Sequence, residues 1–132
     1  MNIVVAGPGL MGSQIGCEFA LGGHEVVFLI NRREEAVRRV DAAFSLAATL
    51  DLWSTETVAE ARGRVTFAVS VDELDPATEI FVESIAEDLA LKSALLASAA
   101  ARMPNAILAS NTSSISITEL GAGGGAPSRT MG

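Results

Sequence analysis

The sequence has 132 residues, 49% of them apolar, and a formal net charge of −7 at pH 7. This length suits a single domain, residues 1–132, with one core. The acidic net charge argues against nucleic-acid binding, which needs a clustered excess of lysine and arginine. One cysteine excludes an intrachain disulfide, and no apolar run approaches the ~18 residues of a membrane span. We therefore expect a cytoplasmic protein with neither nucleic acid nor membrane as partner.

The first half of the chain alternates short apolar runs with apolar residues at helical spacing. Two glycines after the first helical pattern are typical of a helix end. The predicted elements of this half are a strand at Asn2–Ala6, a helix at Leu10–Leu21, a strand at Glu25–Ile30, a helix from about Glu34 to Leu52 and a short helix at Ser54–Arg62.

The second half repeats the alternation and ends in a Gly/Ala-rich stretch. Its predicted elements are strands at Val65–Val69 and Ile80–Glu83, a helix at Leu89–Met103, a strand at Ala106–Ser110, a short helix at Ile117–Leu120 and a loop at Gly121–Pro127. Alternating strands and helices predict an α/β fold of the doubly wound, Rossmann type, with a parallel sheet that is incomplete at its C-terminal end. The predicted core comprises Val4, Val5, Ile15, Phe19, Val27, Leu29, Ile80, Val82, Ile107 and Leu108.

The turn after the first predicted strand reads Gly7-Pro8-Gly9-Leu10-Met11-Gly12, which fits G-x-G-x-x-G. Gly7 permits a tight turn, Gly9 lets the backbone approach a pyrophosphate, and Gly12 lets the helix pack closely. The helix start, with Leu10 and Met11, then presents free N–H groups and a partial positive charge to the phosphates. This motif between a strand and a helix predicts a dinucleotide site, although the same glycines could form a turn without a ligand.

The end of the second predicted strand decides which dinucleotide the site accepts. NAD sites usually place Asp or Glu there to bond the adenosine ribose, but Phe28–Arg33 contains no acid. A neutral Asn31 followed by Arg32 and Arg33 could accept a 2′-phosphate. An anionic partner would also explain two arginines at a helix N-terminus, where the dipole disfavours them. Because solvated arginines are the other interpretation, the cofactor stays open between NAD and NADP.

Three stretches of the chain together resemble the 3-hydroxyacyl-CoA dehydrogenase family. They are Gly7–Gly12 with the following Gly23-His24-Glu25-Val26-Val27, then Val82–Leu89 leading to Lys92, and finally Ile107–Leu120, which contains Ser110-Asn111-Thr112-Ser113-Ser114. The second and third stretches are more specific than the glycine motif, and the similarity spans nearly the whole chain. The resemblance implies NAD-dependent oxidation of an L-3-hydroxyacyl-CoA to its 3-keto form, a reaction of fatty-acid metabolism.

The resemblance also implies roles for three side chains. Glu87 and Lys92 match residues that contact the cofactor on its nicotinamide-ribose side, and Ser113 matches a serine beside the nicotinamide and the substrate oxygen. The segment Ser110–Ser114 follows a predicted strand, so it should lie at the carboxyl edge of the sheet where ligands collect. A hydroxyl there can orient a substrate oxygen, whereas the same segment in isolation would be a polar turn that caps the next helix.

The catalytic histidine of the family is expected beyond Gly132. In the family, S-N-T-S-S leads to a strand and then to H-x-x-N-P, whose histidine is the general base, and Arg129–Gly132 resembles the opening of that strand. His24, the one histidine present, should lie on the opposite edge of the sheet. We therefore expect dinucleotide binding with little dehydrogenase activity, and self-association or a homo-oligomer through the unpaired sheet edge.

The substrate and the class of protein each leave further hypotheses open. In the family a serine and a lysine after the second strand contact CoA; Ser45 could be the serine, but Asp41–Glu60 contains no basic residue. A β-hydroxyacid dehydrogenase or an imine reductase has a similar nucleotide motif followed by Asn-Arg, and a non-catalytic dinucleotide-binding module is the third hypothesis. No metal site is expected, because Asp72, Glu73 and Asp75 resemble a solvated loop.

Overall fold

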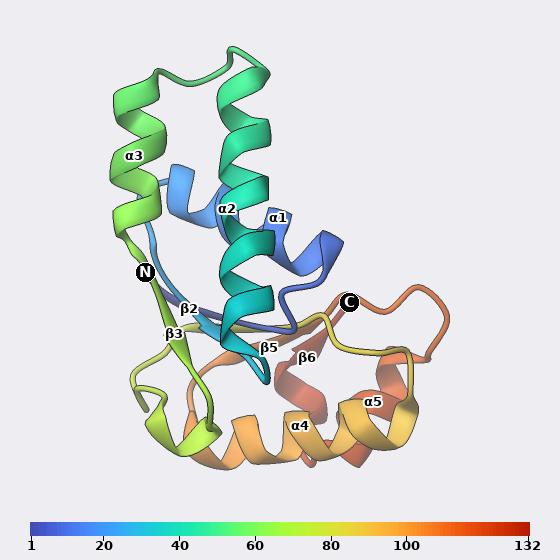
Figure 1. The fold of residues 1–132 in the computed structure, drawn as a ribbon. Coiled ribbons are helices and arrows are strands. Elements are labelled where there is room, and N and C mark those ends of the chain that lie inside the picture. The colour runs from blue at the N-terminus through green and yellow to red at the C-terminus, as the bar shows by residue number, and fades with distance from the viewer.

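The computed structural model describes residues 1 to 132, which form a series of strands and helices along the chain (Figure 1). In chain order the elements are β1 (Asn2–Ala6), α1 (Leu10–Leu21), β2 (Glu25–Leu29), α2 (Arg33–Thr49), α3 (Thr55–Gly63), β3 (Val65–Ala68), η1 (Val71–Glu73), β4 (Ile80–Glu83), α4 (Leu89–Arg102), β5 (Ile107–Ser110), α5 (Ile117–Gly123), η2 (Pro127–Arg129) and β6 (Thr130–Met131). The six strands pair in parallel in the order β3-β2-β1-β4-β5-β6. This order is that of a doubly wound sheet, so the predicted fold class is confirmed.

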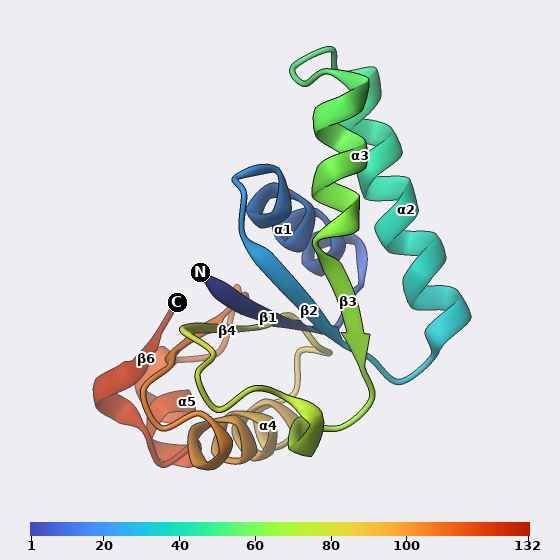
Figure 2. The ribbon, with the colours of Figure 1, turned by 90° about the vertical axis from the view of Figure 1, so that its left-hand side faces the viewer.

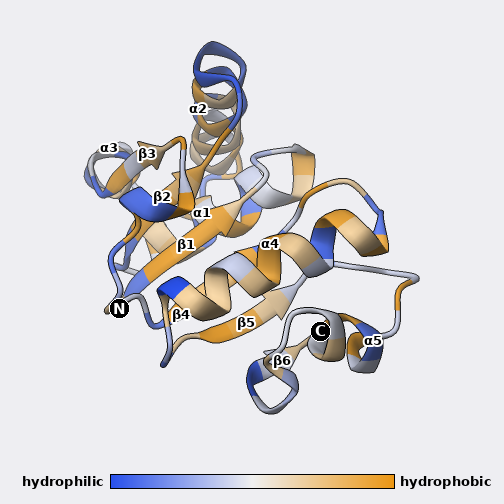
Figure 3. Cartoon of the chain, turned by 90° about the horizontal axis from the view of Figure 1, so that it is seen from below, coloured by the Kyte–Doolittle hydropathy of each residue, from blue (hydrophilic) through white to orange (hydrophobic).

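Helices cover both faces of the sheet, and the strands supply a separate core to each (Figure 2). Val5 and Phe28 belong to the cluster under α1, α2 and α3, whereas Val4, Phe81 and Leu108 belong to the cluster under α4 and α5. This division follows from the alternation of side chains along a strand. The apolar residues accordingly lie along the inner strands, as Figure 3 shows for β1 and β5.

Helix α1 packs closely on the sheet because its inner face carries small residues. A Cβ atom at Gly16 would collide with the ring of Phe28, which is fully buried beneath the helix. Helices α2 and α3 form a hairpin that stands out from the sheet (Figures 1 and 2). None of the helices has the length and apolar character needed to cross a membrane.

Every predicted strand and helix is present, but some details of the prediction are wrong. Gly121–Gly123 continues α5 instead of forming a loop, since these small residues let α5 lie against α4, where a Cβ at Gly123 would be 2.5 Å from the Ser93 hydroxyl. Helix α2 ends at Thr49, three residues before Leu52. Ile107 is 41% exposed at the amino end of β5, while the neighbouring Leu108 is fully buried.

The last strand lies at one edge of the sheet. Thr130 and Met131 pair with Leu108 and Ala109 of β5, which confirms that this segment forms a strand. Arg129 anchors it, since its guanidinium donates hydrogen bonds to the carbonyls of Ala100, Met103 and Ala106. Self-association through this edge stays a prediction.

Candidate functional site

The glycine turn joins β1 to α1 and touches the end of β4. Gly7 has φ +85°, and a Cβ there would lie 2.6 Å from the Ser84 carbonyl oxygen, while a Cβ at Gly12 would collide with the Gly7 carbonyl. Gly9 differs, because the nearest atom to its Cβ position is Nη1 of Arg39 at 3.7 Å. Gly7 and Gly12 therefore serve the close packing of the turn, and the missing side chain of Gly9 leaves space for a ligand.

Helix α1 begins without a group of its own to satisfy its first donors. The first backbone bond into the helix runs from Ser13 to Gly9, so the N–H groups of Leu10, Met11 and Gly12 precede the hydrogen-bond ladder. No side chain caps this helix and its first turn holds no acid, whereas every other α-helix has a capping side chain or an acidic first turn. Such an N-terminus is suited to an anion supplied by a ligand.

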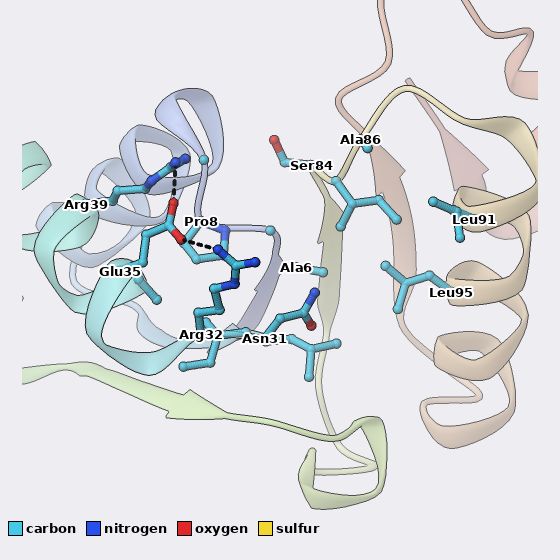
Figure 4. Close-up of a pocket in the computed structure, with 16 residues that line it drawn as sticks. Ala6, Pro8, Asn31, Arg32, Glu35, Arg39, Ser84, Ala86, Leu91 and Leu95 are labelled. Carbon is cyan, nitrogen blue, oxygen red and sulfur yellow. Dashed lines mark hydrogen bonds and ion pairs between the residues drawn. The ribbon is translucent and has the colours of Figure 1, made fainter.

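A cavity of about 620 Å³ opens in front of this turn, at the carboxyl ends of β1, β2 and β4 (Figure 4). The order of the strands reverses here, since β1 lies between β2 and β4, and α/β sheets bind their ligands at such switch points. One wall comes from the glycine turn and the end of β2, and the opposite wall is apolar, with Ile85, Leu91 and Leu95. The cavity thus combines the glycine turn with an apolar surface that is suited to a flat base.

The polar wall of the cavity is formed by Asn31 and by charged residues in the first turns of α2. Asn31 and Arg32 line the cavity, as predicted, together with Glu35 and Arg39. The Glu35 carboxylate lies between the two guanidinium groups, 3.7 Å from Nη1 of Arg32 and 2.6 Å from Nη2 of Arg39 (Figure 4). Arg33 is absent from the lining and lies over the Phe67 ring, 5.7 Å from its centroid. The arginines at this helix start therefore have partners within the chain.

A buried ion pair stands behind the far wall. Lys92, the only lysine of the chain, and Glu83 are both fully buried, with 2.5 Å between Nζ and Oε1. The ammonium group also donates to the Ile85 carbonyl at 3.1 Å, and the other Glu83 oxygen accepts from the Ser110 hydroxyl at 2.6 Å. These bonds join β4, α4 and β5 at the carboxyl edge of the sheet.

Glu87 links the buried pair to the segment after β5. Its Oε2 lies 3.3 Å from Nζ of Lys92, and its Oε1 accepts hydrogen bonds from the Thr112 hydroxyl, the backbone amides of Ser113 and Ser114, and the Ser114 hydroxyl. The Ser113 side chain is exposed and its hydroxyl bonds to no group of the chain. The network therefore holds the backbone of Ser113 and leaves its hydroxyl free.

The hydrogen bond from the Thr112 hydroxyl is the main cause that lowers the pKa of Glu87 from 4.5 to about 2, with Ser114 and Lys92 adding to it against partial desolvation. Because the folded pKa is depressed, the stabilising contribution is present above the unfolded value and is lost as pH falls through about 2. We expect the amide resonances of Ser113 and Ser114 in NMR spectra to titrate near pH 2. In a Thr112→Val variant the midpoint should move toward 4.5, and a wild-type midpoint at 4.5 would contradict this assignment.

The predicted site residues fall into two neighbouring groups. Gly7, Gly9, Asn31 and Arg32 line the cavity, and the side chains of Leu10 and Met11 are exposed beside the turn. Glu87, Lys92 and Ser113 form the second group, which the cavity does not include. The two groups meet where Asn111 donates to the hydroxyl of Ser84, a lining residue, at 3.1 Å.

Two charged residues of the cavity, Glu35 and Arg39, were not among the predicted site residues. Their i,i+4 spacing on α2 is a signal for an ion pair, but the sequence does not reveal that the pair faces the glycine turn. Contact of Lys92 with a cofactor stays a prediction, and the structure shows its ammonium group surrounded by Glu83, Glu87 and Ile85. His24 lies before β2, 3.5 Å from the terminal amine, on the edge opposite the cavity.

Comparisons with known protein families and with curated relatives point to one family of dehydrogenases. The family model described as the NAD-binding domain of 3-hydroxyacyl-CoA dehydrogenase matches residues 2–132. A 3-hydroxybutyryl-CoA dehydrogenase of Clostridioides difficile is 31% identical over 139 residues, which cover 100% of this chain and 48% of that protein.

Solved structures show the same similarity. The fold superposes on FadB2 of M. tuberculosis with a TM-score of 0.88 and 29% identity, over 97% of this chain and 46% of that one. A 3-hydroxybutyryl-CoA dehydrogenase from Escherichia coli also gives a TM-score of 0.88, with 30% identity over 98% of this chain and 28% of that one. The chain spans about half the length of the curated relatives it matches, 48% and 47%.

Proposed function

This chain belongs to the 3-hydroxyacyl-CoA dehydrogenase family, as its NAD-binding domain. We therefore propose that residues 1–132 form one domain, which binds the dinucleotide cofactor used in that family's reaction. The glycine turn would hold the pyrophosphate of the dinucleotide, and the cavity beside it, with Asn31, would hold the adenosine. The observation that carries this proposal is the start of α1, which offers free N–H groups without a cap or an acid. When bound, the nicotinamide supplies hydride transfer.

The residues of the second group fit the reacting end of the cofactor. Glu87 directly follows Ala86, which lines the cavity, and its carboxylate accepts a hydrogen bond from the Ser113 amide. Glu87 positions the segment, with Lys92 behind it, and the free Ser113 hydroxyl orients the oxygen of the substrate. In this proposal Ser113 is the residue of this chain that touches the substrate.

The proton acceptor of the proposed reaction lies outside these residues. A carboxylate with the pKa of Glu87, about 2, is a weak base near neutral pH. Glu83 is fully buried and its oxygens bond to Lys92, Ser110 and the Ile85 amide, and His24 stands at the wrong edge. The domain therefore contributes binding and orientation, and the histidine that the resemblance implies would come from a further part of the enzyme.

An L-3-hydroxyacyl-CoA is the substrate class that this proposal favours. The names of the relatives from C. difficile and E. coli include 3-hydroxybutyryl-CoA dehydrogenase, and such a substrate would place the reaction in fatty-acid metabolism. Ser45, the residue that the resemblance suggests for CoA, is exposed on α2 and so accessible to a ligand. Of the hypotheses raised above, the matched family model favours this one over an imine reductase or a β-hydroxyacid dehydrogenase.

Calorimetry with the 132-residue chain tests the proposed function. We expect saturable binding of NADH, because the N–H groups at the start of α1 are free for a pyrophosphate. ADP-ribose should compete for the same site, since it contains the adenosine and the pyrophosphate, whereas nicotinamide mononucleotide should compete poorly. Absence of binding by NADH and by NADPH, on protein whose circular dichroism shows the folded α/β domain, would overturn the proposal.

A further inference from the structure

We propose that Glu35 selects the cofactor: held between Arg32 and Arg39 on the cavity wall, it admits an adenosine ribose with free hydroxyls and rejects a 2′-phosphate. This inference rests on the proposed dinucleotide site and concerns its specificity. It assigns to a residue of helix α2 the part that an acid at the end of β2 usually plays.

The cavity contains one carboxylate, and it is that of Glu35. Its two oxygens are divided between the flanking cations, with Oε1 2.6 Å from Arg39 and Oε2 3.7 Å from Arg32. The Glu35 side chain is 37% exposed, less than those of Arg39 and Arg32, at 50% and 83%. The carboxylate is therefore the most enclosed of the three charges on this wall.

The end of β2 explains why the carboxylate matters. The residues there are Ile30, which is buried, and Asn31, so the strand itself provides no charge against a 2′-phosphate. Two unopposed arginines beside Asn31 would bind such a phosphate well. With Glu35 between them, each guanidinium already has an anion, and a phosphate dianion entering the wall would meet a negative charge.

The same arrangement suits a ribose with two free hydroxyl groups. A carboxylate oxygen accepts hydrogen bonds from hydroxyls. Glu35 lines the same cavity as Asn31, which follows β2, and in dinucleotide sites the ribose binds at the end of this strand. Arg39 also reaches the glycine turn, with Nη1 3.7 Å from the Cβ position of Gly9. One positive charge thus remains on this wall after Glu35 is counted, which favours the pyrophosphate.

The neighbouring charges do not share this position. Glu34 precedes Glu35 in the first turn of α2, yet it does not line the cavity and forms no ion pair in the chain. Arg33 faces the Phe67 ring instead. Glu34 is therefore a matched control, since its replacement removes the same charge from the same helix turn without touching the cavity.

The test compares dissociation constants for NADH and NADPH in the wild type, in Glu35→Gln and in Glu34→Gln. We expect the wild type to prefer NADH, and Glu35→Gln to bind NADPH about tenfold more tightly and NADH several-fold more weakly. Glu34→Gln should keep the wild-type ratio. In a Glu35→Gln/Arg39→Gln double variant the gain for NADPH should disappear, whereas adding Arg38→Gln should leave it, because Arg38 does not line the cavity.

Failure of this inference can be told apart from failure of the proposed function. If the wild type binds NADH and the Glu35→Gln variant has the same ratio of NADPH to NADH affinity, the selection by Glu35 is wrong and the dinucleotide site stands. A wild-type preference for NADPH would also overturn it. If folded wild type binds neither nucleotide, the proposed function itself fails.

Discussion

A Lys92→Met variant should unfold at a temperature about 10–20 °C below the wild type, because removal of one partner of a buried ion pair costs about 3–5 kcal/mol. Glu83 and Lys92 are both fully buried, with their charged atoms 2.5 Å apart. Methionine fills nearly the same volume as lysine without its charge, so the variant leaves the Glu83 carboxylate uncompensated and creates little cavity. The cost therefore comes from an unpaired buried charge.

Thermal and urea unfolding followed by circular dichroism measure this effect. A Glu83→Gln/Lys92→Met double variant should be more stable than Lys92→Met alone. The amide oxygen can accept from the Ile85 N–H, the amide NH2 can donate to the Ser110 hydroxyl, and no buried charge remains. Arg38→Met is the surface control, because it removes an exposed cation that forms no ion pair in the chain. A loss below about 1 kcal/mol for Lys92→Met, the level of a surface pair, would contradict the assigned role.

Lys92 also supports the segment that carries Ser113. Its ammonium group holds Glu87, and Glu87 in turn accepts hydrogen bonds from the Ser113 and Ser114 amides. The Lys92→Met variant should therefore shift these amide resonances even at temperatures where the domain stays folded. A stability loss without such shifts would show that the ion pair serves the core alone.

A Gly9→Val variant should lose NADH affinity by about a hundredfold or more while keeping the fold. Backbone bonds to a phosphate are charge-assisted and contribute roughly 1.5–3 kcal/mol each, and a side chain at Gly9 would hold the pyrophosphate away from the start of α1. The protein tolerates the change, since Gly9 has φ −73° and ψ −165°, a conformation that valine readily adopts. No atom of the chain lies closer than 3.7 Å to its Cβ position.

Two matched glycine variants separate binding from folding. Gly63→Val adds the same side chain on α3, where no atom lies within 4 Å of the Cβ position, and should leave NADH affinity unchanged. Gly12→Val should instead destabilise the domain, because its Cβ would collide with the Gly7 carbonyl. Calorimetry measures the NADH affinity of the three variants, and thermal unfolding measures their stability. Wild-type affinity in Gly9→Val would place the phosphate elsewhere.

Local patterns in the chain were sufficient to predict the fold. The alternation of β-branched runs with helical apolar spacing placed each strand and helix to within a few residues, and the glycine spacing located the turn between β1 and α1. The least accurate predictions concern which residues within a strand are fully buried. Val27 and Leu29 were predicted for the core, yet Val26 and Phe28 are the fully buried residues of β2. Both faces of a central strand are covered, so its sequence carries little alternation.

Contacts between distant residues determined the rest of the site. The sequence by itself determined that a glycine turn follows β1 and that the segment at Ser113 follows a strand, because both depend on neighbours along the chain. Only the tertiary structure decided that Lys92 is buried against Glu83, that Glu87 holds a segment 25 to 27 residues away, and that Glu35 and Arg39 face the glycine turn. The physical reason is that the burial and pairing of a charge depend on which elements the parallel crossovers bring together. The spacing of residues along the chain does not reveal which distant side chains become neighbours.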